Sequence, residues 1–223
     1  MNKECDQSQS FEEESFRYYS RNYQGKDLAQ IPLNDYLQKV VARQPFAVDI
    51  GSILDIGCCP GSNLYHLKKA LNAKRCVGLE PSSDVVRIMQ NAFLDIEFHS
   101  SNARILPFGC NEFDLVIMRS VLHWVDRNYL LQTLGEAMRV TRHYLLISDY
   151  SPIHAYSAVY RHRIGYKTFK MSYQDLIEAT LFMRCIESSH DHFDDQWNAV
   201  QTALYKKIDL EEAFPIRRET DFR

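Results

Sequence analysis

Short apolar runs alternate with stretches of helical periodicity along the middle of the chain. The runs at 53–56, 75–80 and 113–118 are each bounded by turn or polar residues, as expected of buried strands. Leucines recur at three- and four-residue spacing from Leu64 to Leu71, with lysines between them, which predicts an amphipathic helix after the first run. This order of strand, tight loop and helix is typical of an α/β domain.

The same patterns predict the other elements. A helix ending near Ala92 begins after the capping sequence Ser82-Ser83-Asp84. Further helices are expected at 34–43, 130–140 and 173–182. Further strands are expected at 96–98, 145–150, 182–190 and 198–208.

Length and composition narrow the class of protein. A chain of 223 residues with 45% hydrophobic residues fits one α/β domain with a modest appendage. The formal charge of -3 gives no overall reason to expect a nucleic-acid partner. The six cysteines form no C-x-x-C pair and show no zinc-ligand spacing, so no metal is expected. No apolar stretch reaches ~18 residues, and the polar N-terminus lacks a signal-peptide core. We therefore expect a cytoplasmic protein with no membrane partner.

A glycine-containing turn follows the first apolar run. It reads Asp55-Ile56-Gly57-Cys58-Cys59-Pro60-Gly61 and leads directly into the helical pattern. Gly57 and Gly61 permit backbone conformations closed to other residues and let a ligand approach the main chain. Such loops at the carboxyl ends of parallel strands bind nucleotide-like ligands. The two glycines do not complete the G-x-G-x-x-G fingerprint of dinucleotide binding.

Glu80 ends the second apolar run, 23 positions after Gly57. A carboxylate about 20 residues beyond a glycine loop lies at the tip of the next strand, where it can accept both hydroxyls of a ribose. NAD and S-adenosylmethionine both carry these hydroxyls. Glu80 alone therefore does not separate the two cofactors, and an exposed acid at a strand end is the simpler alternative.

The turn resembles motif I, D/E-x-G-x-G-x-G, of the class I S-adenosylmethionine-dependent methyltransferases. Asp55, Gly57 and Gly61 match the motif, whereas Cys59 stands where the middle glycine usually lies. An ordinary strand–helix turn of another α/β protein is the alternative for this motif taken by itself.

Later segments resemble the small-molecule, methyltransferase type 11-like branch of that family. The most specific likeness is that of 101–108 and 113–118 to its D-A-x-x-L-P-F … F-D-x-V signature, with Asn102 in place of the usual Asp. The segment 119–126 resembles S-x-L-H-H/W, and Glu136 with Arg139 matches E-x-x-R-V. The asparagine amide can still accept a hydrogen bond from an adenine amino group.

This resemblance implies a Rossmann-like three-layer sandwich with a mostly parallel seven-stranded sheet whose last strand is antiparallel. It implies transfer of a methyl group from S-adenosyl-L-methionine, with S-adenosyl-L-homocysteine as product. Residues 1–45 would form a helical cap and 46–223 the methyltransferase domain. The residues expected to hold the cofactor are Tyr23, Asp55, Gly57, Cys58, Gly61, Glu80, Pro81, Asn102, Ala103, Arg119, Ser120 and Trp124.

The stretch 151–172 interleaves aromatic rings with positive charges and contains no acid. We assign it to the methyl acceptor, since guanidinium and imidazole groups suit a phosphate or carboxylate; the alternative is an exposed helix whose cations face water. The candidate catalytic residues are His123, Asp149, His154 and His162. The candidate substrate-binding residues are Tyr19, Tyr150, Tyr156, Tyr160, Arg161, Arg163 and Tyr166.

Each of these assignments has an alternative. His123 takes a proton from the acceptor, orients the cofactor or simply packs at a strand–helix junction, and Asp149 contacts the acceptor or caps the next turn. The aromatic segment 15–23 either packs its rings on the domain or closes over the cofactor. We expect a small-molecule acceptor methylated on O or N, a phosphate-bearing metabolite such as a nucleotide sugar being one candidate, and a monomer or homodimer. The alternatives are a catalytically silent cofactor-binding subunit and a methyltransferase acting on RNA or protein.

Overall fold

The computed structural model describes residues 11–43, 45–163, 165–192 and 199–209. Cys5 and Asn198, which the sequence analysis included, lie outside these ranges. The strands are β1 (Ser52–Ile56), β2 (Arg75–Glu80), β3 (Glu97–Ser100), β4 (Phe113–Arg119), β5 (Thr141–Tyr150), β6 (Tyr156–Val159), β7 (Lys167–Lys170), β8 (Met183–His192) and β9 (Ala199–Lys207). The α-helices are α1 (Phe11–Asn22), α2 (Asp35–Ala42), α3 (Ser62–Ala70), α4 (Ser83–Ala92), α5 (Leu130–Val140) and α6 (Gln174–Glu178).

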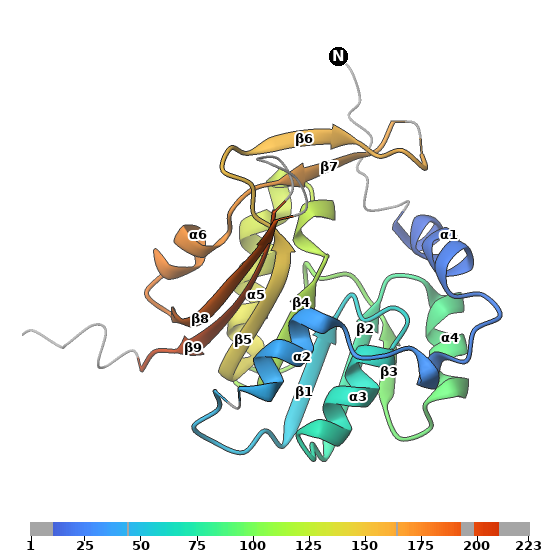
Figure 1. Cartoon of the computed structure of the whole chain (residues 1–223), viewed down its shortest axis with the longest axis horizontal. Helices are drawn as coiled ribbons and strands as arrows, with labels where there is room; N and C mark the ends of the chain where they lie inside the picture. Colours follow the sequence, from blue (N-terminus) through green and yellow to red (C-terminus); the bar gives the residue numbers. More distant parts are fainter. Residues whose placement is uncertain (1–10, 44, 164, 193–198, 210–223) are drawn as a thin grey trace, which may run out of the picture.

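A seven-stranded sheet in the order β3-β2-β1-β4-β5-β9-β8 crosses the molecule (Figure 1). The strands from β3 to β5 pair in parallel, and β9 pairs antiparallel with both β5 and β8. The predicted mostly parallel sheet with an antiparallel last strand is therefore confirmed. The chain leaves β1 toward β2 on one side and returns as β4 on the other. This reversal opens a crevice at the carboxyl ends of β1 and β4, where ligands of open α/β sheets bind.

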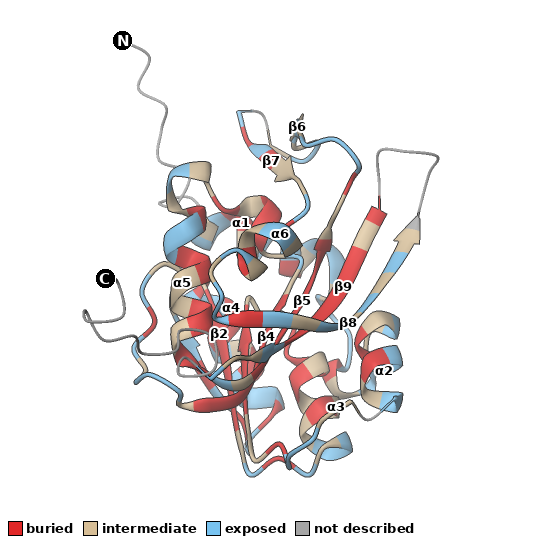
Figure 2. Cartoon of the chain, turned by 90° about the vertical axis from the view of Figure 1, so that its left-hand side faces the viewer, coloured by how far each residue is buried: buried red, intermediate tan, exposed pale blue. Residues whose placement is uncertain are grey.

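Successive residues of each central strand serve two separate cores. On β1, Ile53 contributes to a core with leucines of α3 and apolar residues of α4, whereas Leu54 contributes to a core with residues of α5 and α6. Parallel strands covered on both faces become apolar throughout, as the sequence showed. Figure 2 shows the strands largely buried and the outward faces of the helices exposed. No helix in the described ranges is long and apolar enough to cross a membrane.

Three regions differ from the sequence prediction. Strand β5 begins at Thr141, directly after α5, rather than at 145. Arg142 explains the extension, because its guanidinium pairs with Asp114 at 2.7 Å and fastens the start of β5 beside β4. The stretch 151–172 forms the antiparallel hairpin β6–β7, so the alternative of an exposed helix was wrong. Helix α6 is also shorter than predicted and ends before Leu181, whose φ of 58° lies in the left-handed region.

Candidate active site

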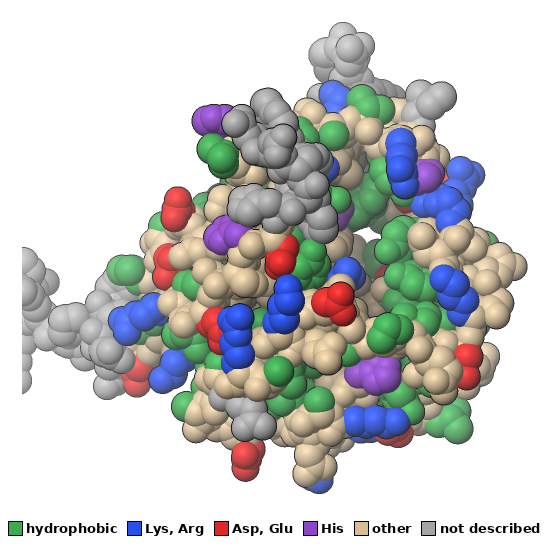
Figure 3. All heavy atoms as spheres, viewed as in Figure 1, with side chains coloured by type: hydrophobic (Ala, Val, Ile, Leu, Met, Phe, Trp, Pro, Cys, Tyr) green, Lys and Arg blue, Asp and Glu red, His purple; other side chains and the backbone are tan. Residues whose placement is uncertain are grey.

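A cavity of about 960 Å³ lies at the carboxyl ends of the central strands. Its walls come from the loops after β1, β2, β3 and β4, from helix α1, and from the hairpin β6–β7. In the space-filling view, the surface is hollowed between the part that carries the hairpin and the body below it (Figure 3). The volume is in the upper part of the range typical of small-molecule sites.

The two glycines of the turn after β1 adopt backbone conformations that other residues rarely take, as predicted. The structure adds a second reason for glycine at these positions, the close packing of neighbouring side chains. Gly57 and Gly61 have φ values of +75° and +87°. A Cβ atom on Gly57 would lie 2.4 Å from Val121, and one on Gly61 would lie 3.0 Å from Phe93. Both positions thus require glycine for the packing of the protein itself. Cys59 lines the cavity, whereas the Cys58 side chain is buried behind the turn.

Glu80 places a nearly buried carboxylate at the tip of β2, on the cavity wall. The side chain is 3% exposed. Burial raises its pKa, and hydrogen bonds from the Ser15 hydroxyl and the backbone N–H groups of Ser82 and Cys59 partly offset that rise. Two of these donors come from other parts of the fold, Cys59 from the turn after β1 and Ser15 from helix α1. Glu80 is therefore a strong acceptor that faces the cavity beside a displaceable hydroxyl.

Asp55 occupies a different environment from the one the motif suggests. It is 4% exposed and lies behind the cavity wall. Burial raises the pKa of its carboxyl to about 7, against the opposing influence of the Arg119 guanidinium. Asp55 thus lies beneath the turn, and its expected contact with the cofactor stays a prediction.

This burial makes stability depend on pH. An unfolded carboxyl releases its proton near pH 4 but the folded chain holds it to about pH 7, so stability falls as pH rises between these values. Asp55→Asn should therefore stabilise the chain over wild type by about 3 kcal/mol more at pH 8 than at pH 5. Urea unfolding at both pH values measures this difference.

Asp95→Asn is the matched control for that experiment. A hydrogen bond from Lys68 lowers the pKa of Asp95, so this group titrates below the window. The difference in unfolding free energy between this variant and wild type should be the same at pH 5 and pH 8. An Asp55→Asn difference that is equally flat would contradict the raised pKa.

The loop after β3 lines the cavity with Asn102, Ala103 and Arg104. The Asn102 side-chain oxygen accepts a hydrogen bond from the Arg104 backbone N–H at 3.0 Å, which fixes the loop. An amide oxygen has a second lone pair, so this contact leaves capacity for a ligand. The Arg104 guanidinium lies 3.4 Å from the centre of the Tyr129 ring.

A histidine–aspartate pair stands at the ends of β4 and β5. Asp149 is 2% exposed, and its carboxylate accepts hydrogen bonds from His123 Nδ1 at 2.8 Å and from the backbone N–H groups of Tyr150 and Leu122. Burial opposes ionisation, but the interaction with His123 and these hydrogen bonds outweigh it and lower the pKa of Asp149. The carboxylate is thus ionised and can only accept, so Nδ1 of His123 carries hydrogen and Nε2 is left to accept a proton.

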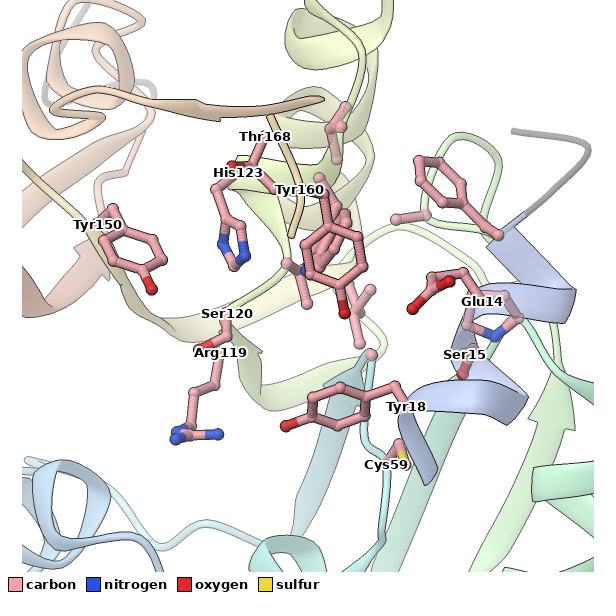
Figure 4. A pocket seen from close by; sticks show the side chains of 18 of the residues that line it. Glu14, Ser15, Tyr18, Cys59, Arg119, Ser120, His123, Tyr150, Tyr160 and Thr168 are labelled. Atoms are coloured by element: carbon pink, nitrogen blue, oxygen red, sulfur yellow. The ribbon is translucent and has the colours of Figure 1, made fainter. Parts of the chain in front are cut away.

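Aromatic and basic side chains surround this pair. The His123 ring projects into the cavity between Tyr150 and Tyr160 (Figure 4), and its centre lies 4.9 Å from that of Tyr150. Trp124 packs edge-on against Tyr160 at 4.6 Å. From the hairpin, Lys170 lies 4.0 Å from the centre of the Tyr150 ring. This half of the cavity therefore combines one proton acceptor with flat rings and positive charge.

Helix α1 forms the wall opposite the histidine (Figure 4). Ser15 donates to Glu80, and the Glu12 carboxylate accepts from the Ser83 hydroxyl at 2.7 Å. On the other side, Arg21 donates to the Tyr160 hydroxyl at 2.7 Å. Arg163 of the hairpin loop pairs with Glu13 at 2.9 Å. The helix is thus attached both to the end of β2 and to the hairpin.

The cavity brings together many of the residues named from sequence. These are Gly57, Glu80, Pro81, Asn102, Ala103, Arg119, Ser120, His123, Trp124, Tyr150, Tyr160, Arg161 and His162. It also includes residues that the sequence analysis did not name, among them Phe11, Glu14, Ser15, Tyr18, Arg21, Asn22, Tyr36, Thr168 and Lys170.

Other predicted residues do not line the cavity, and their surroundings give the reasons. Tyr19 and Cys58 belong to the core, and Gly61 begins α3. Tyr23 packs against Tyr18 and Tyr19 beneath α1. In the region of the hairpin, His154, Tyr156, Arg163 and Tyr166 also do not line the cavity. His154 is exposed before β6, and the Arg163 guanidinium lies over the Tyr166 ring. Asp55 and Asp149 lie behind the wall.

The family model of a methyltransferase domain matches residues 53–143, which span β1 to the start of β5 and include part of the wall of this cavity. Over this range the chain is similar to a methyltransferase domain, a class of enzyme that takes its methyl group from S-adenosyl-L-methionine. No curated protein matches the sequence at a significant level.

Solved structures of methyltransferases share the fold of this chain at low sequence identity. The 1,6-didemethyltoxoflavin-N1-methyltransferase of Burkholderia thailandensis, with bound 1,6-didemethyltoxoflavin and S-adenosylhomocysteine, is 12% identical with a TM-score of 0.67, covering 92% of this chain and 91% of its own. A putative sarcosine dimethylglycine methyltransferase from Galdieria sulphuraria is 11% identical with a TM-score of 0.65, covering 88% and 99%. A methyltransferase from Methanosarcina mazei is 16% identical with a TM-score of 0.62, covering 75% and 97%.

The residues that line the cavity fit this donor. Glu80 offers a buried acceptor suited to ribose hydroxyls, and the Arg119 side chain has a buried Nε atom without a hydrogen-bond partner. Both face the same cavity. The cavity thus holds complementary groups for a sugar and for an anion.

Proposed function

We propose that the chain methylates an O or N atom of a small metabolite that carries a negatively charged group. The observation that supports this most is the pair formed by His123 and the buried Asp149, which faces a basic, aromatic half of the cavity. The donor supplies an activated methyl carbon when bound. What the protein adds is the alignment of the acceptor, an entropic contribution that can reach ~7–11 kcal/mol.

Glu80, together with the loop residues Asn102 and Ala103, would hold the nucleoside part of the donor. Glu80 accepts from the ribose hydroxyls, and the Asn102 amide reaches the adenine edge. The turn from Gly57 to Cys59 would lie against the amino-acid part. These roles use groups that already face one cavity, and they require no rearrangement of the strands.

His123 is the proposed general base. Its Nε2 takes the proton from the acceptor hydroxyl or amine as the new bond to carbon forms, and the Asp149 carboxylate stabilises the resulting imidazolium. Asp149 acts through His123 and is a positioning residue. A base at this place favours acceptor atoms that must lose a proton during methylation over atoms whose lone pair reacts without loss of a proton.

The charge balance of the lining supports an anionic acceptor. Five Lys or Arg side chains line the cavity against three Asp or Glu side chains. Lys170 of the hairpin lies over the ring of Tyr150, which contacts His123, and Arg161 lines the cavity next to Tyr160 in the chain. A phosphate or carboxylate on a cyclic metabolite would pair with the cations while its ring stacks on the tyrosines.

Helix α1 is the proposed cover of the site. It reaches both the end of β2, through Ser15 and Glu80, and the hairpin, through Arg21 and Tyr160. Exclusion of water by such a cover strengthens the electrostatic interactions inside. This proposal assigns residues 1–45 to a cap and 151–172 to acceptor binding.

Methyl transfer from labelled donor to a metabolite extract tests the proposal. We expect one product heavier by a single methyl group, retained on an anion exchanger, together with S-adenosylhomocysteine. Titration of the chain with S-adenosylhomocysteine should show binding in the same preparation. Binding without any labelled small molecule would contradict the proposed activity and indicate a silent subunit.

A further inference from the structure

Glu14 of α1 places a nearly buried carboxylate in the wall of the cavity, and the sequence analysis did not name it. The residue is 4% exposed. Its Oε1 atom accepts a hydrogen bond from Arg21 at 2.8 Å, and the same arginine donates to the Tyr160 hydroxyl at 2.7 Å. Within the described ranges its Oε2 atom has no hydrogen-bond partner, and the Arg163 guanidinium stays 3.9 Å from it. One carboxylate oxygen of this wall therefore has capacity for a further donor.

A row of aromatic rings connects Tyr160 to His123, the proposed base. The Tyr160 ring centre lies 4.6 Å from that of Trp124, and the Trp124 ring centre lies 5.3 Å from that of His123. All three residues line the cavity. In Figure 4, Glu14 and Tyr150 lie on opposite sides of the His123 ring. Glu14 therefore marks one end of this row of rings.

A cation stands at the other end of the row. The Lys170 Nζ atom lies 4.0 Å from the centre of the Tyr150 ring, and that ring centre lies 4.9 Å from the His123 ring centre. The proposed base is therefore between a positive group and a negative group, with aromatic rings on both sides. A molecule that lies along these rings with its reacting atom at His123 meets Lys170 with one end and Glu14 with the other.

The contacts of Glu14 favour the acceptor over the methyl donor as its ligand. Its neighbour Ser15 donates to Glu80, the proposed ligand of the ribose. The Glu14 carboxylate instead lies beside Arg163 of the hairpin loop, in the segment proposed for acceptor binding. Glu14 therefore belongs to the acceptor half of the cavity.

Resting on the proposed function, we propose that Glu14 binds a protonated amino group of the acceptor, so that the acceptor is a zwitterion whose anionic group lies near Lys170. The ammonium donates to Glu14 Oε2 in a charge-assisted hydrogen bond, and the face of the Tyr160 ring attracts the same cation. The last torsion of a glutamate varies broadly, so Oε2 can turn toward the amine while α1 stays in place. A metabolite with the anionic group alone leaves this buried oxygen without a donor and is therefore a poorer substrate.

The labelled product of the metabolite extract gives the first test. Because the amine at Glu14 is not the methylated atom, the product should still react with an N-hydroxysuccinimide ester, which acylates amines, and should then lose its retention on a cation exchanger. A labelled product that carries no amine would overturn the assignment and leave the proposed methyl transfer intact. Absence of any labelled product would overturn the proposed function, and this assignment with it.

The kinetics of Glu14→Gln give the second test. KM of the identified acceptor should rise about 10- to 100-fold, since the amide loses the charge that holds the ammonium. The value of kcat at saturation and the affinity for S-adenosylhomocysteine should change little. Glu14→Asp should recover part of the loss. Asp84→Asn, which removes an exposed acid of α4, is the matched control and should leave KM at the wild-type value.

The N-acylated acceptor separates recognition of the amine from support of the fold. In wild type its KM should exceed that of the free amine, and Glu14→Gln should remove most of this difference. An equal rise of both KM values in the variant would show that Glu14 only supports α1, and would overturn the assignment. A loss of affinity for S-adenosylhomocysteine without a change in the acceptor KM would overturn it as well and assign Glu14 to the donor.

Discussion

Replacing His123 with glutamine is expected to lower kcat by about 10²- to 10⁴-fold, the usual contribution of a positioned base. The substitution keeps a polar side chain of similar length but removes the atom that accepts the proton. The measurement is kcat for the acceptor identified by methyl labelling, at saturating donor. The affinity for S-adenosylhomocysteine should change little, since the proposed nucleoside contacts come from other residues.

A second variant separates catalysis from packing. Asp149→Asn should also lower kcat strongly, because an amide no longer fixes hydrogen on Nδ1. His99→Gln, at an exposed position on β3, is the matched control. An unchanged kcat in His123→Gln would mean that the acceptor needs no base.

Glu80→Gln is expected to weaken binding of S-adenosylhomocysteine about 100-fold. The amide loses the negative charge that would accept two ribose hydroxyls, and hydrogen bonds to charged groups contribute ~1.5–3 kcal/mol each. Titration calorimetry measures the loss directly. The fold should persist, because burial disfavours the charge of Glu80 and its removal relieves that cost.

Glu97→Gln provides the control for this change. Glu97 is an exposed acid on the neighbouring strand β3, and it lies outside the cavity. Its replacement alters the net charge by the same amount and should leave the affinity at the wild-type value. If Glu80→Gln bound the ligand as tightly as this control, the ribose would have to be held elsewhere.

The strands and helices of the central sheet could be predicted because each follows a local pattern. Arg75–Glu80 and Leu130–Val140 have in the structure the bounds read from their apolar spacing. The start of β5 could not be predicted in this way. It depends on the pairing of Arg142 with Asp114, which is 28 residues away in the sequence.

The choice of site residues on α1 shows where sequence reasoning was insufficient. Tyr19 of α1 and Tyr23, which follows the helix, pack against the domain, one of the two alternatives given for segment 15–23. The face toward the cavity carries Ser15, Tyr18 and Asn22, at three- and four-residue spacing. That periodicity is visible in the sequence, but which face meets the cavity depends on how the helix docks.

The hairpin poses the same problem in another form. Thr168 and Lys170 line the cavity because alternate residues of strand β7 point to the same face. The many aromatic and charged residues of this stretch hide that two-residue period in the sequence. Arg163 was expected to meet the acceptor. It instead pairs with Glu13 of α1, a partner 150 residues away that local sequence could not reveal.

The hydrogen bond between Ser15 and Glu80 has a consequence for the affinity of the site. The hydroxyl occupies an oxygen that a sugar would need, so an arriving nucleoside would compete with a group tethered to the same chain. Displacement of Ser15 would lower the apparent affinity by the fraction of molecules in which Glu80 is released.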